Sequence, residues 1–267
     1  MVELEQALSS RCLQTVRAET KAYGLTIALT VILLWAGSLA FLLSLDVPSA
    51  QTWWVWPAML WQTFLYTGLF VTAHDAMHGG VYPQNSTVNR FVGSLAVRLY
   101  ALFSYEKLLK RHGLHHQHPA SQTDPDFHDG ENQNVVIWYL QFMKRYWSWT
   151  QIFGLMIVFN IFSRVLHVSE LNLTLFWVVP SLLSSVQLFF FGTYLPHHEP
   201  EGGYQNQQHR TQSSGFPIFW SFVTCYHFGY HEEHHEYPQV PWWRLPTVHK
   251  VLSQQPEVPL PAYSVEV

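Results

Sequence analysis

Histidine is the residue type through which this chain could do chemistry. Its 267 residues include 16 histidines, more than the 14 Lys and Arg together. Neutral imidazole is a common metal ligand, and a helix places positions i and i+4 about 40° apart around its axis. Three short clusters, which we call the histidine boxes, have i, i+3 or i+4 spacing and therefore predict a metal centre: His74 and His78; His112, His115 and His116; His231, His234 and His235.

The number of imidazoles indicates two metal ions. Imidazole suits Zn, Cu, Fe and Ni, and one tetrahedral zinc needs only four ligands. Eight or more imidazoles fit two ions with four or five ligands each, which leaves room for oxygen or substrate. The Glu-x-x-His motif of soluble di-iron bundles should occur twice, but it occurs once, as Glu232–His235. We therefore expect an all-histidine site, with carboxylates hydrogen-bonded to the ligands.

Further polar side chains lie near the boxes in the sequence. His197 directly follows a long apolar segment and is the candidate for a ninth ligand, whereas His227, four residues before His231, is the competing candidate. His209 and His249 are expected at the surface. Other possible ligands, or hydrogen-bond partners of ligands, are Asp75, His118, Asp124, Asp126, His128 and Glu232.

Apolar helices must position the boxes. Apolar residues make up 48% of the chain and charged residues 12%, against about 25% charged in soluble domains. Four apolar segments lie at about 25–45, 53–73, 150–168 and 173–195, and the first matches a hydrocarbon core of about 30 Å. We predict an all-α integral membrane protein. Its four transmembrane helices form two hairpins, and interfacial helices accompany a cytoplasmic, histidine-rich di-metal cap.

The distribution of basic residues predicts how the four helices are oriented across the membrane. The short loops Asp46–Thr52 and Ser169–Asn172 contain no Lys or Arg, and every basic residue except Arg164 falls on the other side. The positive-inside rule places both termini and the boxes in the cytoplasm. Residues 1–24 then form a cytoplasmic segment, 25–246 the membrane domain with the metal centre, and 247–267 a tail.

The cytoplasmic part contains apolar patterns of its own. Residues 88–103 repeat as an amphipathic helix that we expect to lie in the membrane interface; a core helix of a soluble cap is the alternative. Residues 138–149 and 216–230 are rich in aromatic side chains, as interfacial belts are. Residues 202–215 are expected to be a loop. The net charge of −4 argues against nucleic-acid binding.

The residues around the boxes resemble the bacterial β-carotene ketolase family, within the membrane di-iron fatty acid desaturase and hydroxylase superfamily. The resemblance extends from about Leu25 to Pro246, and in one departure Ala120 stands where glycine is expected after His118-Pro119. Its motifs are His74-Asp-Ala-Met-His-Gly79, Asp124-Pro-Asp-Phe-His128, Phe191-Gly-Thr-Tyr-Leu-Pro-His197, Cys225–Pro238 and Pro241-Trp-Trp-Arg-Leu-Pro246.

The resemblance implies a di-iron oxygenase that acts on carbon 4 of the β-ionone ring. Two O2-dependent hydroxylations would give a geminal diol, which loses water, so that β-carotene would become echinenone and then canthaxanthin. The chain has no dinucleotide fingerprint. Its two cysteines are too few for an iron–sulfur cluster. Electrons would therefore come from an external donor such as ferredoxin, and the apolar substrate from the lipid membrane.

Three other readings of the boxes remain. A fatty-acyl desaturase or hydroxylase has the same boxes and the same membrane plan. An intramembrane zinc protease would use the HExxH motif, with Glu232 as general base and His231 and His235 on zinc. A bis-histidine haem carrier would need histidines within its apolar helices, and three of the four segments have none.

Overall fold

The computed structural model describes residues 2–47, 52–130 and 132–253, and only the backbone of residues 2–9. Within these ranges every regular element is helical, which confirms the predicted all-α class. Most of the expected outer loop Asp46–Thr52 lies outside the described residues, as does the expected tail from residue 254 onward.

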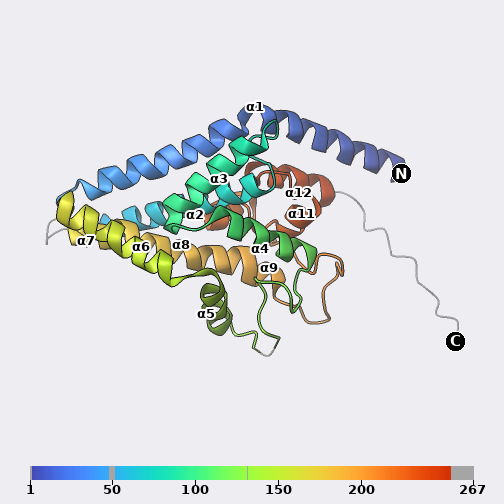
Figure 1. Ribbon diagram of the computed structural model, residues 1–267. Helices are drawn as coiled ribbons and strands as arrows, with labels where there is room; N and C mark the ends of the chain where they lie inside the picture. The colour runs from blue at the N-terminus through green and yellow to red at the C-terminus, as the bar shows by residue number, and fades with distance from the viewer. Residues whose placement is uncertain (1, 48–51, 131, 254–267) are drawn as a thin grey trace.

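Three long helices form the framework (Figure 1). The helix α1 (Val2–Leu43) runs along one edge of the molecule, and α2 (Val55–Met77) lies inside it. The third long helix continues from Glu170 to His197. Two five-residue π-helical segments interrupt it, so it consists of α7 (Glu170–Leu173), η2 (Thr174–Val178), α8 (Val179–Phe189), η3 (Phe190–Tyr194) and α9 (Leu195–His197).

Two helical segments are long and apolar enough to cross a membrane, Ser10–Leu43 and Glu170–His197. They contain most of the first expected span and all of the fourth. Most of the second lies in α2, and most of the third lies in a shorter apolar helix, Trp149–Val165. Large apolar side chains on these helices are exposed, with Leu33 70% and Ile157 61% accessible. Such a surface is unusual for a soluble protein and suits contact with lipid.

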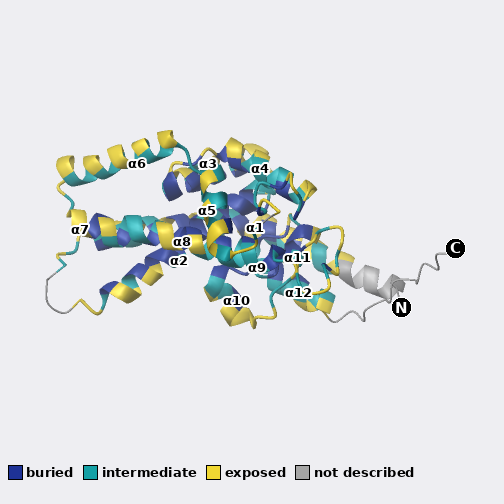
Figure 2. Ribbon diagram, turned by 90° about the horizontal axis from the view of Figure 1, so that it is seen from below, coloured by how far each residue is buried: buried dark blue, intermediate teal, exposed yellow. Residues whose placement is uncertain are grey.

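The turn between the last two apolar segments lies earlier than expected. The helix α6 (Trp149–Asn160) continues as η1 (Ile161–Val165), and the chain is helical again from Glu170. The connection is therefore 166–169 instead of Ser169–Asn172. Arg164, the basic residue expected within a span, forms an ion pair with Glu170 across this turn at 3.1 Å. The two exposed charges thus lie together at the turn between α6 and α7, which Figure 2 shows at one end of the molecule.

Shorter helices surround the end of α2 that carries the first box. Asn85 caps the next helix, because its side chain accepts hydrogen bonds from the amides of Thr87 and Val88. Ser104 starts the helix after it in the same manner. These elements are α3 (Ser86–Ala101), α4 (Tyr105–Gln117), α5 (Val135–Tyr146), α10 (Ile218–Cys225), α11 (His231–Glu236), η4 (Trp242–Arg244) and α12 (Leu245–Ser253).

The core lies around α2, which packs against α1, α3 and α8. The amphipathic helix α3 turns Val92 and Ala96 into this core, whereas Phe91 on its other side is 69% exposed. One face of the helix is therefore held by α2. A hydrogen-bond distance of 2.9 Å between the hydroxyls of Thr67 and Ser184 joins α2 to α8. This polar contact holds α2, which carries His74, against the long composite helix that ends at His197.

Candidate metal centre

Nine imidazoles converge at the end of α2. They form two groups, and within each group the candidate ligand atoms lie within 4.8 Å of one another. The five-histidine group consists of His74, His78, His112, His116 and His234, and the four-histidine group consists of His115, His197, His231 and His235. The structure thus brings together all eight box histidines and His197.

Two of the boxes are divided between the groups. In α4, His112 and His116 belong to the five-histidine group and His115 to the other. In α11, His231 and His235 stay together, whereas His234 faces the five-histidine group. Around a helix, the side chain at i+4 is rotated slightly from that at i in one sense, whereas the side chain at i+3 is rotated from i in the other sense. The i and i+4 side chains can therefore point to one group while the i+3 side chain points to the other. Each of these helices therefore supplies both groups.

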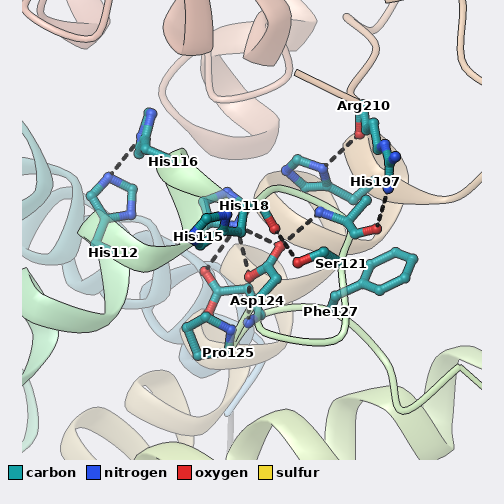
Figure 3. A network of polar contacts seen from close by, with 12 residues as sticks. His112, His115, His116, His118, Ser121, Asp124, Pro125, Phe127, His197 and Arg210 are labelled. Carbon is teal, nitrogen blue, oxygen red and sulfur yellow. Dashed lines mark hydrogen bonds and ion pairs between the residues drawn. The ribbon is translucent and has the colours of Figure 1, made fainter. Parts of the chain in front are cut away.

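His197 reaches its group from the end of the long composite helix. The π-helical turn η3 and Pro196 immediately precede it, and a π turn shifts the register of the residues that follow. The ring is 1% exposed, and its Nε2 lies 3.0 Å from Nε2 of His231. Its Nδ1 donates to the carbonyl of Arg210 at 3.0 Å (Figure 3). With Nδ1 carrying the proton, Nε2 has a free lone pair.

The spacing of the ring nitrogens fits bound metal ions. Six Nε2–Nε2 pairs within the cluster are 2.7 to 3.2 Å apart. Two nitrogens each about 2.1 Å from one ion, at a right angle, would be about 3.0 Å from each other. His116 Nε2 faces both His112 and His234, so protons alone cannot satisfy all of these contacts. A shared cation would remove the repulsion between the lone pairs.

The imidazoles of the five-histidine group remain neutral at neutral pH. Burial, and then the neighbouring histidines, lower the pKa of His78 to about 4 and that of His116 to about 2. His115 differs, because the Asp124 carboxylate outweighs the effect of burial and raises the pKa of its ring. Neutral imidazole is the form that binds metal, so the electrostatics of the five-histidine group agree with the spacing of its rings.

Carboxylates lie beside the four-histidine group, where Asp124 and Asp126 form a third possible metal-binding group with His115. Asp124 accepts from Nδ1 of His115 (Figure 3). It also accepts from the amides of Ala120 and Asp126. Asp126 Oδ2 lies 3.8 Å from the same Nδ1, and Oδ1 accepts from the Tyr146 hydroxyl. Burial raises the pKa of Asp126 to about 6. Asp124 therefore fixes the orientation of the His115 ring, and Asp126 lies beside it.

The other candidate residues lie outside the two groups. His227 contacts the Ser221 hydroxyl through Nδ1, and His128 accepts from the Gly130 amide. His118 is an exposed residue at the end of α4. Glu232 accepts from Asn206. Asp75 accepts from the amide of Trp242, and its Oδ1 is 3.6 Å from Nδ1 of His74.

Two histidines expected at the surface, His209 and His249, are partly exposed and have acidic partners. His249 Nδ1 lies 2.6 Å from Glu233, and its ring stacks on Tyr230. His209 Nε2 lies 2.9 Å from Glu236. Glu233, which the sequence pattern did not single out, is buried and also accepts from the Ser213 hydroxyl. Its position inside a histidine box, next to candidate ligands, is the sequence feature by which it could have been recognised.

A cavity of about 100 Å³ adjoins both groups. Four imidazoles form part of its wall, together with aromatic and aliphatic side chains from α2, α3, α5 and α8. The polar atoms at its edge include those of Asp126, Ser185 and Thr193. Its other lining residues include Phe70, Met77, Phe103, Leu108, Phe142, Leu188 and Phe228. The geometry allows an apolar group to lie against the histidines.

Comparison with known proteins agrees with these features. The profile of the fatty acid desaturase family matches residues 51–171 and 136–265. A β-carotene ketolase of Paracoccus sp. (strain PC1) is 42% identical over 189 residues, which cover 70% of this chain and 76% of that protein. A zeaxanthin 4-ketolase of Chlamydomonas reinhardtii is 40% identical over 242 residues. A β-carotene 4-ketolase of Protosiphon botryoides is 36% identical over 253 residues.

The matched lengths differ among these relatives. The alignment with the Chlamydomonas protein covers 85% of this chain but only 53% of that protein. The alignment with the Protosiphon protein covers 87% of this chain and 65% of that protein. The chain thus spans about half of the longest of these relatives and three quarters of the Paracoccus one.

Proposed function

The chain belongs to the fatty acid desaturase family and, within it, to the β-carotene ketolases, and from this we propose that it oxidises carbon 4 of the β-ionone ring to a ketone. β-Carotene would become echinenone, with one ketone, and then canthaxanthin, with two. The reaction class is that of an oxidoreductase that uses O2. A fatty-acyl desaturase of the same family is the second candidate, because it would need the same histidines.

One observation supports the proposal most directly. The apolar cavity has His74, His112, His115 and His231 in its wall, so both histidine groups adjoin the same space. An unsubstituted β-ionone ring is an apolar group that could be held there by aromatic side chains such as Phe103. Those side chains would exclude water from the reacting carbon.

We propose that two iron ions are held by the two histidine groups. The neutral, closely spaced imidazoles suit divalent transition metals, and no carboxylate belongs to either group. When bound, iron would supply the activation of O2 that oxidation of a C–H bond requires. Asp124 keeps the proton of His115 on Nδ1, and the Arg210 carbonyl does the same for His197. Nε2 of each ring is then available as the ligand atom.

The stoichiometry requires an external reductant. Each hydroxylation consumes one O2, two electrons and two protons and releases one water. A second hydroxylation at the same carbon gives a geminal diol, which loses water. One ketone therefore needs four electrons. The chain's two cysteines, Cys12 and Cys225, cannot hold an iron–sulfur cluster. We propose that a carrier such as ferredoxin supplies these electrons.

The same proposal includes a multi-pass arrangement in the membrane. Four spans would place both termini and all nine imidazoles on the cytoplasmic side, because the basic residues lie there. The carotenoid would enter from the lipid, whereas the reductant would come from the cytoplasm. This arrangement separates the apolar substrate from the electron donor.

Pigment analysis of β-carotene-producing cells tests the function. Cells that express the wild-type chain should accumulate echinenone and canthaxanthin, and a His116→Ala variant should leave β-carotene unchanged. His118→Ala is the matched control, because this exposed histidine lies outside both groups. If the wild-type protein binds iron but leaves the carotenoids unaltered while the acyl lipids change, the fatty-acyl alternative is correct.

A further inference from the structure

A second, larger hollow leads from the surface to the five-histidine group. This groove has a volume of about 530 Å³ and lies between α1, the turn after α2, α3 and α4. His78 is one of its lining residues. His78, His112 and His116 are only partly buried, whereas all four members of the other group are buried. The groove is therefore an approach from water to one half of the metal centre.

The groove is positively charged. Arg17 and Lys21 from α1 and Arg90 from α3 line it, and no carboxylate does so in the part of the chain that the structure describes. Glu106 lies near it as the partner of Arg90, at 3.2 Å, and both of these side chains are mostly exposed. The chain as a whole has a net charge of −4. The positive groove is thus a local feature rather than a result of composition.

Beyond Lys21, toward the predicted span, α1 packs against the turn before α3. Gly24, three residues after Lys21, is packed so tightly that a Cβ there would lie 2.6 Å from the carbonyl oxygen of Val81. Gln84 adds a bridge, because its amide donates to the carbonyl of Lys21 at 3.1 Å. These contacts join α1 to the turn before α3 at the point where the apolar stretch of α1 begins. They favour a partner from the aqueous side over a lipid headgroup.

We propose that this groove is the docking site of an acidic, one-electron carrier protein, which passes its electrons to the five-histidine group by way of His78. The inference rests on the proposed function, which requires four electrons for each ketone. Each docking would oxidise the carrier by one electron and reduce the iron held by this group by one electron. A hydride donor transfers two electrons at once, so it would need a flavin that passes them on singly. The sequence has no dinucleotide fingerprint that would indicate such a cofactor.

Binding measurements test the docking site without depending on turnover. The iron-loaded full chain, in nanodiscs of zwitterionic lipid, is titrated with an acidic plant-type ferredoxin at low and high ionic strength. The variant Arg17→Gln/Lys21→Gln should bind about tenfold more weakly at low ionic strength, mainly through a slower association rate, and should show a weaker salt dependence. Iron per chain and melting temperature should match those of the wild type.

The matched control removes two positive charges elsewhere. Lys144→Gln/Lys250→Gln changes two exposed lysines that do not line the groove, and its affinity should stay within about twofold of the wild type. Equal affinity of the groove variant and the wild type would overturn the proposal. It would also be overturned if the groove variant lost binding to anionic vesicles but not to ferredoxin. Turnover of the wild-type protein with dithionite as reductant tests the proposed function separately.

Discussion

His115 and Asp124 form a buried pair in which the ring Nδ1 lies 3.0 Å from both carboxylate oxygens. Their side chains are 4% and 1% exposed. Because the carboxylate can only accept, Nδ1 must carry the proton, and the Nε2 lone pair points toward His235, whose Nε2 is 3.2 Å away. Asp124 therefore selects the tautomer that can bind a metal.

Replacing Asp124 with Asn should weaken metal binding. An amide can accept through only one atom, and Nδ1 of His115 is equally close to both carboxylate oxygens. The new NH2 group would therefore face the His115 ring together with either the Ala120 amide or the Asp126 amide, both of which now donate to Asp124. We expect about 10- to 100-fold weaker retention of metal, measured as iron per chain after dialysis against a graded chelator. Asp46→Asn, at an exposed carboxylate remote from the cluster, is the control. Unchanged retention in Asp124→Asn would argue against the tautomer role.

Loss of one histidine from either group should remove metal from that group first. His116→Ala affects the five-histidine group and His235→Ala the four-histidine group. We expect two irons per wild-type chain, fewer in each variant, and no ketone formation, because the proposed reaction uses both groups. Metal analysis of purified protein at equal folded yield makes the comparison. The same loss of ketone is expected for each of the other box histidines. Near-normal canthaxanthin yield in three or more of the eight alanine variants would contradict the di-iron assignment.

The histidine boxes could be recognised from the sequence because they are local patterns. Spacing within α4 and α11 predicts which side chains share a face. It does not predict that His115 and His234 turn toward the opposite group from their neighbours, since that depends on where the helices cross. The π-helical turn η3, which sets the direction of His197, has no sequence signature that we recognise.

Ala120 connects the sequence resemblance to the backbone. Glycine was expected there, and the structure places Ala120 at φ 50°, in the left-handed region. A residue with a Cβ loses about 1–2 kcal/mol in this conformation, whereas glycine costs more entropy on folding. The departure is tolerated because the contact with Asp124 is made by the backbone amide, which any residue except proline can supply.

Ala120→Gly should therefore stabilise the protein. We expect a gain of about 0.5–1 kcal/mol in the free energy of unfolding, seen as a higher melting temperature with unchanged iron per chain. Ala96→Gly, in the middle of α3, is the matched control and should destabilise by about 1 kcal/mol. A lower melting temperature for Ala120→Gly would mean that the positive φ is not a source of strain.

The predicted membrane topology can be tested with reporter fusions. A reporter fused after Asp46 should lie outside the cytoplasm, and one fused after Gly202 should lie inside it, because the two short outer loops have no basic residues. Gly202 lies in an exposed turn that follows His197 by five residues. If both reporters lie on the same side of the membrane, the number of spans between them is even, which contradicts the three that we expect.

His197 and His227 are the two histidines outside the boxes that competed for the ninth ligand position, and their surroundings differ. His197 ends a packed helix and faces His231 Nε2 at 3.0 Å. His227 has φ 64° and precedes α11, which starts only at His231, so i+4 spacing on a helix does not apply to it. Its ring lies parallel to that of Tyr230, and its Nδ1 contacts Ser221.

We therefore expect His197→Ala to lower iron per chain and remove activity, and His227→Ala to impair activity while retaining more of the iron. Removal of the His227 ring takes away packing against Tyr230, next to the start of α11, so a moderate effect on the site is anticipated. Iron is measured at equal folded yield for both variants. His197→Gln serves as a second replacement that keeps more of the side-chain volume and should still lose iron. Full iron in His197→Ala with loss in His227→Ala would assign the ninth ligand to His227.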